Sequence, residues 1–328
     1  MAATTVCFED GKLVLMKAMI ITANGGPEVL ALRDVPVPAV GMGQLLVKVQ
    51  AAAVNPIDCK LRKTGAFGFG PESILGFDVC GTIERMGPDV TGFAVGESVY
   101  YSPDFSGPGG YAQYHLVQAS LAAPKPSTLS FIDAAALPLA GQMAWDGILE
   151  RGQVRLGDTV LIHGASGGVG SLAVQLAHAA GAYVFATCSA ANAGLVRSLG
   201  ADYVIDHGAE DFVQIIREQT HGRGLDMVYD CFGGDLVVRS MPIVRPLGRI
   251  ITIVNPTGDL SVGYRRNVSI HYLFLQRSRR TLEAISNLIE RRQVKPVVNR
   301  VLPLEEAAQA HRLLEAGGGF GKIVLTVG

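Results

Sequence analysis

A glycine-rich turn is the clearest chemical signal in the amino-acid sequence. It comprises His163-Gly164-Ala165-Ser166-Gly167-Gly168-Val169-Gly170, directly after an apolar run and directly before a helical stretch. Small residues let backbone N–H groups approach a ligand closely, and the start of a helix adds the positive end of its dipole. Such a turn can hold a pyrophosphate, although its glycines depart from a strict G-x-G-x-x-G spacing. The alternative is a tight turn with a purely structural role. We predict that a dinucleotide binds here, through Gly164, Ala165, Ser166, Gly167, Gly168, Val169 and Gly170.

The end of the next apolar run bears on the choice of dinucleotide. An Asp or Glu there would bind the adenosine ribose hydroxyls and favour NADH. The sequence reads Thr187-Cys188-Ser189-Ala190-Ala191-Asn192 and contains no acid. Ser189 and Asn192 can donate hydrogen bonds to a 2′-phosphate, and Arg197 can supply charge unless it is a solvated helix residue. The sequence therefore favours NADPH, with NADH as the alternative.

The elements around this turn alternate between strands and helices. Strands are expected at Thr159–His163, Tyr183–Thr187, Tyr203–Ile205, Met227–Asp230 and Gly248–Ile253, with helices at Ser171–Ala180, Ala191–Leu199 and Asp211–Gln219. This order is typical of a parallel sheet covered on both faces. Before it, residues 16–137 hold short β-prone segments between Gly and Pro turns, which predicts a compact antiparallel domain. The tail is expected to fold back onto that first domain, with two helices and two strands at Arg279–Arg292, Val297–Val301, Leu304–Glu315 and Lys322–Val327.

Composition limits the classes of partner. The chain has 328 residues, enough for two domains, and its formal net charge of -1 without a basic segment argues against nucleic acid. No apolar stretch reaches the roughly 18 residues of a membrane span. The five cysteines form no Cys-x-x-Cys pair, which argues against a disulfide framework and fits the cytoplasm. The stretch from Met1 to Leu15 lacks the features of a secretory signal and is expected to carry no chemistry.

Six further segments carry recognisable motifs. They are Ala53-Val54-Asn55-Pro56-Ile57-Asp58, Ile74-Leu75-Gly76-Phe77-Asp78-Val79-Cys80-Gly81, Gly109-Gly110-Tyr111-Ala112, Leu199-Gly200-Ala201-Asp202, Tyr229-Asp230-Cys231-Phe232-Gly233-Gly234 and Gly321-Lys322-Ile323-Val324-Leu325. Together with the glycine-rich turn, and in this order, they resemble the zinc-independent part of the medium-chain dehydrogenase/reductase superfamily, in its quinone oxidoreductase branch. The resemblance covers the chain from about Met16 onward.

The resemblance implies an α/β fold of two domains with an active-site cleft at their junction. A GroES-like β-rich catalytic domain is expected at 16–138, completed by 290–328, and a Rossmann doubly wound parallel-sheet domain at 139–289. The resemblance also implies a homodimer or homotetramer. Some NADPH-dependent members carry Lys at the position of Asn192 and Tyr at the position of His207, so this chain departs from them there. Besides the glycine-rich turn, the expected cofactor-binding residues are Ser189, Asn192, His207, Phe232 and Val254.

The positions that hold catalytic zinc in the zinc-dependent branch are occupied differently here. That branch has Cys at the position of Asn55 and a His-Glu pair at Phe77-Asp78. Phenylalanine cannot ligate a metal, and the four closely spaced cysteines of a structural zinc lobe are missing from the sequence. The sequence therefore predicts no metal site.

Asn55 and Lys60 are the predicted catalytic residues. The family places an asparagine beside the nicotinamide at position 55, where its amide can bond the cofactor ribose or the substrate oxygen; the alternative is a turn cap before Pro56. Lys60 resembles the lysine of quinone and alkenal reductases of the chloroplast-envelope type, and can bind the ribose or stabilise a developing enolate. The alternative for Lys60 is an exposed surface lysine. Met143 stands where Thr is usual near the nicotinamide, and replaces a hydrogen bond by an apolar contact.

Hydride transfer without a metal favours particular acceptors. A quinone or an α,β-unsaturated carbonyl compound delocalises the resulting oxyanion, so modest hydrogen bonds can stabilise it, whereas a simple alkoxide needs zinc or a strong acid. The sequence thus predicts NADPH-dependent reduction of a small quinone or enone. Specificity is expected from the loops at Thr64–Glu72, Tyr101–Gly110 and Tyr264–Gln276. Three alternatives remain: an enoyl-thioester reductase, a non-catalytic NADPH-binding protein and a zinc-free alcohol oxidoreductase.

Overall fold

A computed structural model describes residues 6–9 and 12–328 of the chain. These residues form two compact units, each with its own hydrophobic core. The first unit holds the residues up to Leu139, together with Arg277–Glu290 and Pro296–Gly328. The second holds Ala140–Gln276 and Arg291–Lys295.

A six-stranded parallel sheet forms the centre of the second unit, in the order β12-β11-β10-β13-β14-β15. The central strand β10 is buried on both faces, as expected for a parallel sheet. The chain runs outward from β10 to β12 and returns beside β10 with β13, so the strand order reverses between β10 and β13. The strands are β10 (Thr159–His163), β11 (Tyr183–Cys188), β12 (Tyr203–Asp206), β13 (Leu225–Asp230), β14 (Val244–Thr252) and β15 (Ser269–Tyr272).

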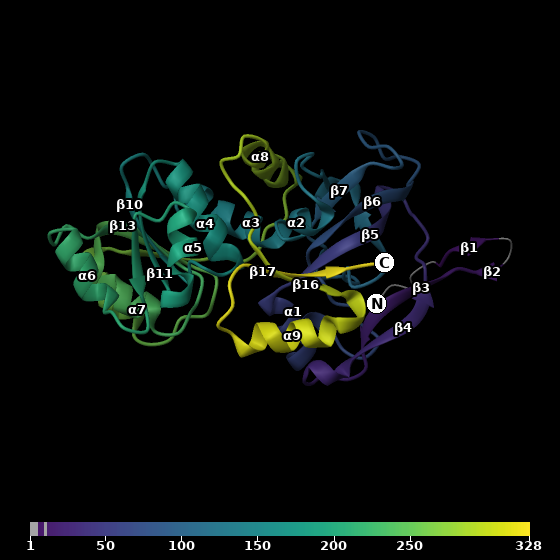
Figure 1. Cartoon of the computed structure of the whole chain (residues 1–328), viewed down its shortest axis with the longest axis horizontal. Helices are drawn as coiled ribbons and strands as arrows, with labels where there is room; N and C mark the ends of the chain where they lie inside the picture. The colour runs from purple at the N-terminus through teal and green to yellow at the C-terminus, as the bar shows by residue number, and fades with distance from the viewer. Residues whose placement is uncertain (1–5, 10–11) are drawn as a thin grey trace. The chain divides into compact units, whose positions relative to one another are not determined.

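Helices cover both faces of this sheet, and Figure 1 shows α4 and α5 on one side of the strands and α6 and α7 on the other. This arrangement confirms the predicted doubly wound α/β fold. The helix α3 (Pro138–Trp145) spans the point in the chain where the second unit begins. The other helices are α4 (Gly168–Ala179), α5 (Ala193–Ser198), α6 (Phe212–Gln219) and α7 (Leu236–Ser240).

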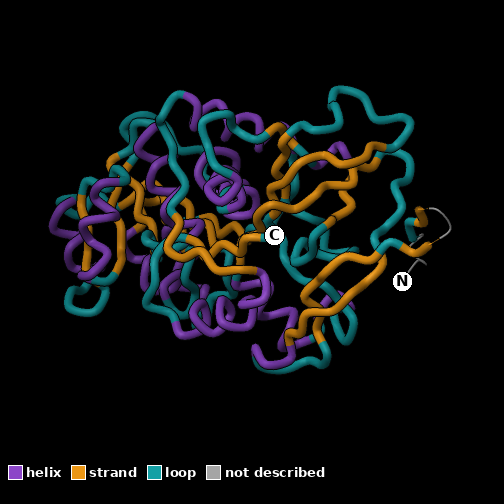
Figure 2. The backbone as a smooth tube through the Cα atoms, turned by 45° about the vertical axis from the view of Figure 1, so that its right-hand side comes forward, coloured by secondary structure: helices purple, strands orange, loops and turns teal. Residues whose placement is uncertain are grey.

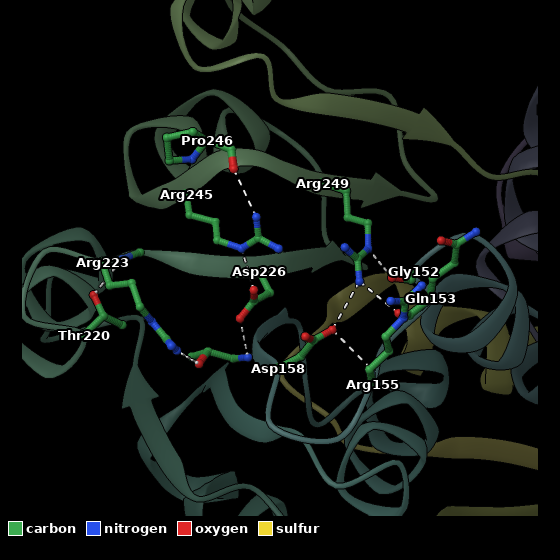
Figure 3. Close-up of polar contacts among 12 residues, drawn as sticks. Gly152, Gln153, Arg155, Asp158, Thr220, Arg223, Asp226, Arg245, Pro246 and Arg249 are labelled. Atoms are coloured by element: carbon green, nitrogen blue, oxygen red, sulfur yellow. Dashed lines mark hydrogen bonds and ion pairs between the residues drawn. The ribbon is translucent and has the colours of Figure 1, made fainter.

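A network of charged side chains ties together the strands of the second unit near their amino ends (Figure 3). Asp226 at the start of β13 accepts hydrogen bonds from Thr159 N at 2.8 Å and from Arg245 Nε at 2.5 Å. Arg249 on β14 donates to Asp158 Oδ2 at 3.2 Å and to the carbonyl oxygen of Gly152. These contacts hold β10, β13 and β14 in register at the edge opposite their carboxyl ends.

The first unit is built around a sheet that is antiparallel except for the parallel pair β16–β17, and its central strand β5 pairs with three others, β6, β8 and β17. Figure 2 shows these strands in orange. The strands of the sheet are β5 (Gln44–Val54), β6 (Val79–Met86), β7 (Ser98–Tyr101), β8 (Tyr114–Gln118), β9 (Ala123–Pro124), β16 (Val298–Pro303) and β17 (Lys322–Thr326). Pairing of β17 with β5 brings the two ends of the sequence together in one core, as the sequence analysis expected of the tail.

Two hairpins lie at the start of the chain. The strands β3 (Leu15–Ile21) and β4 (Leu30–Pro36) pair along their whole length, and β1 (Phe8–Glu9) pairs with β2 (Lys12–Leu13). Cys7 is buried and donates its N–H to Val37 O at 2.8 Å. Val6 and Cys7 therefore pack on the first unit; residues 1–5, 10 and 11 lie outside the described part of the chain.

Four helices complete the first unit: α1 (Pro56–Thr64), α2 (Phe131–Ala135), α8 (Arg279–Glu290) and α9 (Ala307–Ala316). The helix α8 differs from the expected domain division, which grouped it with the parallel sheet. In the structure Tyr100 Oη of β7 donates to Leu282 O at 2.6 Å, and it lies 2.8 Å from Ser286 Oγ. These buried contacts fix α8 to the first unit.

Several absences hold for residues 6–9 and 12–328. No helix among them is long and apolar enough to cross a bilayer. No group of three or more His, Cys, Asp and Glu side chains among them is placed to hold a metal ion. All five cysteines are free.

Candidate functional site

The predicted cofactor-binding residues lie at the carboxyl ends of the parallel strands. The glycine-rich turn follows β10, Ser189 follows β11, and His207 follows β12. Phe232 follows β13 within two residues, and Val254 follows β14. In open α/β sheets ligands bind outside the carboxyl ends of the strands, where the strand order reverses. The turn after β10 stands at that reversal point.

The glycine-rich turn has the geometry of a phosphate cradle. Gly164 adopts φ +69°, a left-handed conformation that favours glycine, and Gly167 is the residue that precedes α4. A Cβ atom at Gly170 would lie 2.2 Å from Gly164 O, so only glycine fits. The first turn of α4 therefore sits directly against the end of β10, with the N–H groups of Gly168 and Val169 at a partly exposed helix start. These features fit a pyrophosphate.

The residues after β11 adjoin this turn. Asn192 Nδ2 donates to Ser166 Oγ at 3.2 Å, and Ala165 N donates to Thr187 O at 3.0 Å. Ser189 is half-buried, and His207 is exposed, with its N–H bonded to Cys188 O at 3.1 Å. The structure therefore brings Ser166, Ser189, Asn192 and His207 to neighbouring strand ends. Asp206, the last residue of β12, pairs with Cys188 in the sheet, so one carboxylate does lie near this end.

The residues after β13 and β14 lie on the other side of the glycine-rich turn from those after β11 and β12. Asp230 Oδ1 accepts from Phe232 N at 3.0 Å and Gly233 N at 2.9 Å, while Asp230 Oδ2 accepts from Thr252 Oγ1 at 3.0 Å. This buried carboxylate locks the two strand ends together. Phe232 and Val254 remain 71% and 39% exposed, so both can offer apolar surface to a flat ring.

His163, at the end of β10, is a core residue. Its Nδ1 lies 3.1 Å from Thr187 Oγ1 and its Nε2 lies 3.0 Å from Ser240 Oγ. Burial, reinforced by the positive charge of Arg239, lowers the pKa of His163 to about 3. The imidazole is therefore neutral at physiological pH and connects β10 to β11 and α7.

In the first unit, three buried side chains form a polar cluster around Asn55. Lys322 on β17 donates to Asp78 Oδ2 at 2.8 Å and also to Asn55 Oδ1. Asn55 Nδ2 donates to the same Asp78 Oδ2 at 2.8 Å. Asp78 Oδ1 accepts from Leu139 N at 2.5 Å. The buried charge of Asp78 is thus paired and hydrogen-bonded, as a buried charge must be.

This cluster fixes which way the Asn55 amide points. Lysine only donates and carboxylate only accepts, so the oxygen of Asn55 faces Lys322 and its nitrogen faces Asp78. The second N–H of Nδ2 has only Ala53 O near it, at 3.4 Å, a long and weak contact. Asn55 can therefore offer a ligand the N–H that Ala53 O holds only weakly, and the second lone pair of its amide oxygen.

Asn55 also precedes the helix α1. Pro56 occupies the first helical position and Asp58 Oδ2 accepts from Asn55 N at 2.6 Å. Asp58 Oδ1 accepts from Gly76 N at 3.0 Å. Burial is the largest effect on the Asp58 carboxyl and raises its pKa to about 7. Asp58 thus bonds to two backbone N–H groups and joins the start of α1 to the segment at Gly76.

Lys60 lies elsewhere on α1. It is exposed and borders a shallow pocket of about 360 Å³ together with Pro56, Cys59, Lys63, Thr64, Leu314 and Glu315. The lysine that joins Asn55 is Lys322, which the sequence analysis placed in a family motif but gave no role. Its contact with Asn55 spans 267 positions of the chain, and no local pattern could have indicated it.

Phe77, whose side chain has no atom that can bind a metal, occupies the position of the zinc-binding histidine. Phe77 is fully buried and packs edge-on against Phe69 and Phe105, with ring centroids 5.6 and 4.6 Å away. The side chains beside it offer a metal one carboxylate, Asp78, which Lys322 already neutralises. The residues present do not fit a catalytic zinc ion.

Comparison with known proteins assigns the chain to a family. Residues 41–127 match the family described as alcohol dehydrogenase GroES-like domain, and residues 199–325 match the family described as zinc-binding dehydrogenase. The quinone oxidoreductase of Rattus norvegicus is 32% identical over 325 residues, which cover 95% of this chain and 98% of that protein. The 2-methylene-furan-3-one reductase of Solanum lycopersicum is 35% identical over 326 residues, or 94% of this chain and 79% of that protein.

Solved structures agree with the sequence relatives. One described as an NAD-dependent alcohol dehydrogenase superimposes with a TM-score of 0.89 at 34% identity, over 95% of this chain and 100% of that one. The likeness extends over nearly the whole sequence. The chain is therefore an oxidoreductase that belongs to the medium-chain dehydrogenase/reductase superfamily, in its quinone oxidoreductase branch.

Proposed function

We propose that this protein transfers hydride from NADPH to a small quinone or α,β-unsaturated carbonyl compound, without zinc. The observation that carries the proposal is the Lys322–Asp78–Asn55 cluster. The buried ammonium group of Lys322 donates hydrogen bonds to Asn55 and Asp78, whose positions hold zinc ligands in the zinc-dependent branch. A chain without a Lewis acid suits acceptors whose oxyanion is delocalised. The names of the rat and tomato relatives point to the same two acceptor classes.

The proposed roles follow from the donors present. Bound NADPH supplies a hydride from its nicotinamide ring, and one proton from solvent completes the two-electron reduction of the acceptor. The glycine-rich turn binds the pyrophosphate, and Phe232 and Val254 offer apolar surface to the rings. Asn55 donates its remaining N–H to the acceptor's oxygen, where negative charge develops. We retain Lys60 as a second candidate for the ribose or the enolate.

NADPH is the proposed cofactor because no acid follows β11. Ser189 and Asn192 can donate to a 2′-phosphate, and Arg197 is exposed nearby on α5. The carboxylate of Asp206 at the end of β12 acts against a preference for NADPH, because it repels a 2′-phosphate. We therefore expect a preference for NADPH over NADH that is measurable but not absolute.

The outer strand of the parallel sheet supports the proposed homodimer. The strand β15 is an edge, paired only with β14 among the described residues. Tyr264, Tyr272 and Phe274 beside it are 86%, 62% and 58% exposed, more aromatic surface than an edge in water usually carries. A second copy of the chain that pairs along β15 would bury these aromatic side chains.

One alternative has an observation in its favour. The solved structure described as an NAD-dependent alcohol dehydrogenase is 34% identical to this chain, against 32% and 35% for the rat and tomato relatives, which favours an alcohol oxidoreductase as the alternative. Alcohol-dependent reduction of NADP⁺ or NAD⁺ would reveal it.

Cofactor oxidation tests the proposal directly. Chelator-treated protein would be mixed with NADPH and with 1,4-benzoquinone, 9,10-phenanthrenequinone or a short 2-alkenal, and the series repeated with NADH. We expect turnover with at least one acceptor, unchanged by chelator and faster with NADPH. Cofactor binding without turnover of any acceptor would refute the assignment. Loss of turnover on chelation would refute zinc independence alone.

A further inference from the structure

Among the buried side-chain nitrogen and oxygen atoms of the described residues, Nη2 of Arg277 alone lacks a hydrogen-bond partner. The Nε atom of Arg277 donates to Pro103 O at 2.6 Å, and its guanidinium carbon lies 4.3 Å from the centroid of the Phe105 ring. The Nη2 atom is buried and has no hydrogen-bond partner among residues 6–9 and 12–328. Leaving a buried donor unsatisfied is destabilising, and more so when the donor is charged. The fold itself gives no reason for this cost.

The surroundings of Arg277 are aromatic. Phe105 stacks on Phe67 with ring centroids 5.7 Å apart and an interplanar angle of 9°, and it meets Phe77 edge-on at 4.6 Å. Phe105 and Phe67 come from the loops at Tyr101–Gly110 and Thr64–Glu72, which the sequence analysis expected to set specificity. Stacked rings offer a flat surface that suits a planar, unsaturated ligand.

The backbone at Phe67 is strained. Its φ of +56° is a conformation that a bulky side chain rarely adopts, and its ring is 62% exposed. Gly65 and Gly68 flank it, also at positive φ. Residues held in strained backbone conformations cluster at active sites and ligand-binding loops.

The aromatic cluster adjoins the polar cluster through two consecutive residues. Phe77 contacts Phe105, and the next residue, Asp78, holds the amide of Asn55. Arg277 is close enough to Asp78 and Asp104 for their charges to act on its guanidinium group. The first unit thus presents the weakly bonded second N–H of Asn55 and the unsatisfied Nη2 of Arg277, with aromatic surface beside them.

From this arrangement we infer that Arg277 is a specificity-determining residue, whose Nη2 binds the second carbonyl oxygen of a planar aromatic diketone. The inference rests on the proposed function and narrows it to extended quinones. An alkenal has one carbonyl oxygen, which the Asn55 donor suffices to bind. A quinone has two, and the second one meets the otherwise unsatisfied donor of Arg277.

The test compares two acceptors in two arginine variants. For Arg277→Met we expect the KM for 9,10-phenanthrenequinone to rise about tenfold, which corresponds to about 1.4 kcal/mol, with kcat nearly unchanged. The KM for trans-2-hexenal should change less than about twofold. Arg279→Met is the matched control, because Arg279 also stacks on a phenylalanine, Phe93 at 4.6 Å, but is paired with Glu283 at 2.7 Å. It should change neither KM.

Two further variants guard against misfolding of the loop. Arg277→Lys keeps the charge with fewer donors and should give an intermediate KM for the quinone. Phe67→Leu alters an exposed side chain and should raise the same KM by at least about threefold. An equal change for both acceptors, or none for the quinone, would overturn the role of Arg277.

The two proposals fail in different ways. If the wild-type protein reduces 9,10-phenanthrenequinone and Arg277→Met does so with the same KM, the inference fails and the proposed function stands. If the wild-type protein reduces no acceptor, the proposed function fails. Calorimetric titration with the quinone then decides the inference, since a Kd unaffected by Arg277→Met would overturn it and a tenfold weaker one would support it.

Discussion

At the scale of single residues, the buried ion pair between Lys322 and Asp78 makes the sharpest prediction. Lys322→Met leaves the Asp78 carboxylate buried without its counter-ion, and breaking such a pair typically costs about 3–5 kcal/mol. Urea unfolding followed by circular dichroism should show a loss of that size. A loss below about 1 kcal/mol would show that Asp78 is solvated or neutral in the native protein.

Lys63 provides the matched control for this prediction. It pairs with Glu315 at 3.0 Å, but its side chain is 52% exposed. Exposed pairs contribute at most about 1 kcal/mol, so Lys63→Met should scarcely change the unfolding free energy. The double variant Lys322→Met with Asp78→Asn removes both charges, and it should recover part of what the single variant loses.

The same residues show how far a sequence can predict this site. Asn55 and Asp78 stood in recognised motifs, and the glycine-rich turn was identified from its residue types alone. Lys322 was not connected with them, because β17 reaches β5 only through the folded sheet. Lys60 had the closer spacing to Asn55, but the helical turn of α1 directs it to solvent. Spacing along the chain predicts contacts within one element and not those made by sheet pairing.

At the scale of elements, the packing of α4 against β10 depends on Gly170. A methyl group there would approach Gly164 O to 2.2 Å, and the three nearest atoms it would meet all belong to the backbone. Gly170→Ala should therefore shift the start of α4, lower the unfolding free energy by about 1–3 kcal/mol, and weaken NADPH binding. Titration with NADPH and thermal unfolding would measure the two effects.

Gly194→Ala is the corresponding control in a neighbouring helix. Gly194 lies in α5, where an added Cβ has open space around it. Alanine has the higher helix propensity by about 1 kcal/mol, so this variant should be neutral or slightly stabilising. If Gly170→Ala behaved like Gly194→Ala, the close approach of helix and strand would not be what requires glycine.

The elements themselves were predicted unevenly. All five strands expected in the parallel sheet are present, because long buried runs of branched residues carry a strong signal. The strand β15 was expected to be a loop, since Ser269–Tyr272 is short, half-exposed and mixed in polarity. The helices α1 and α7 were missed for a related reason: α1 contains Pro56 and several charged residues, and α7 has only five residues.

At the scale of the whole molecule, both units contain buried neutral histidines, namely His163 in the second unit and His115 and His311 in the first, and these lower the stability of the protein in acid. In the second unit the pKa of His163 is lowered to about 3, mainly by burial. In the first unit the pKa of His311 is also lowered to about 3, by burial and by the guanidinium of Arg62, which lies 2.8 Å from Nδ1. An unfolded histidine titrates near 6.5. Between these values the unfolded chain binds more protons than the native one, so stability falls as the pH falls from about 6.5.

Variants of His163 and His311 separate the contribution of each side chain to the pH dependence of the unfolding free energy. In urea unfolding at pH 7 and pH 5, the stability of the wild-type protein relative to His163→Gln should decrease by about 2 kcal/mol, and relative to His311→Gln by a similar amount. The raised pKa of Asp58, about 7, acts in the opposite direction, but it is common to all the proteins compared and cancels. His178→Gln, which alters an exposed histidine, should show the same change in unfolding free energy between pH 7 and pH 5 as the wild type. If all three variants showed the same pH dependence of stability as the wild type, the buried imidazoles would be protonated in the native state. Arg62 would then need an acceptor other than His311.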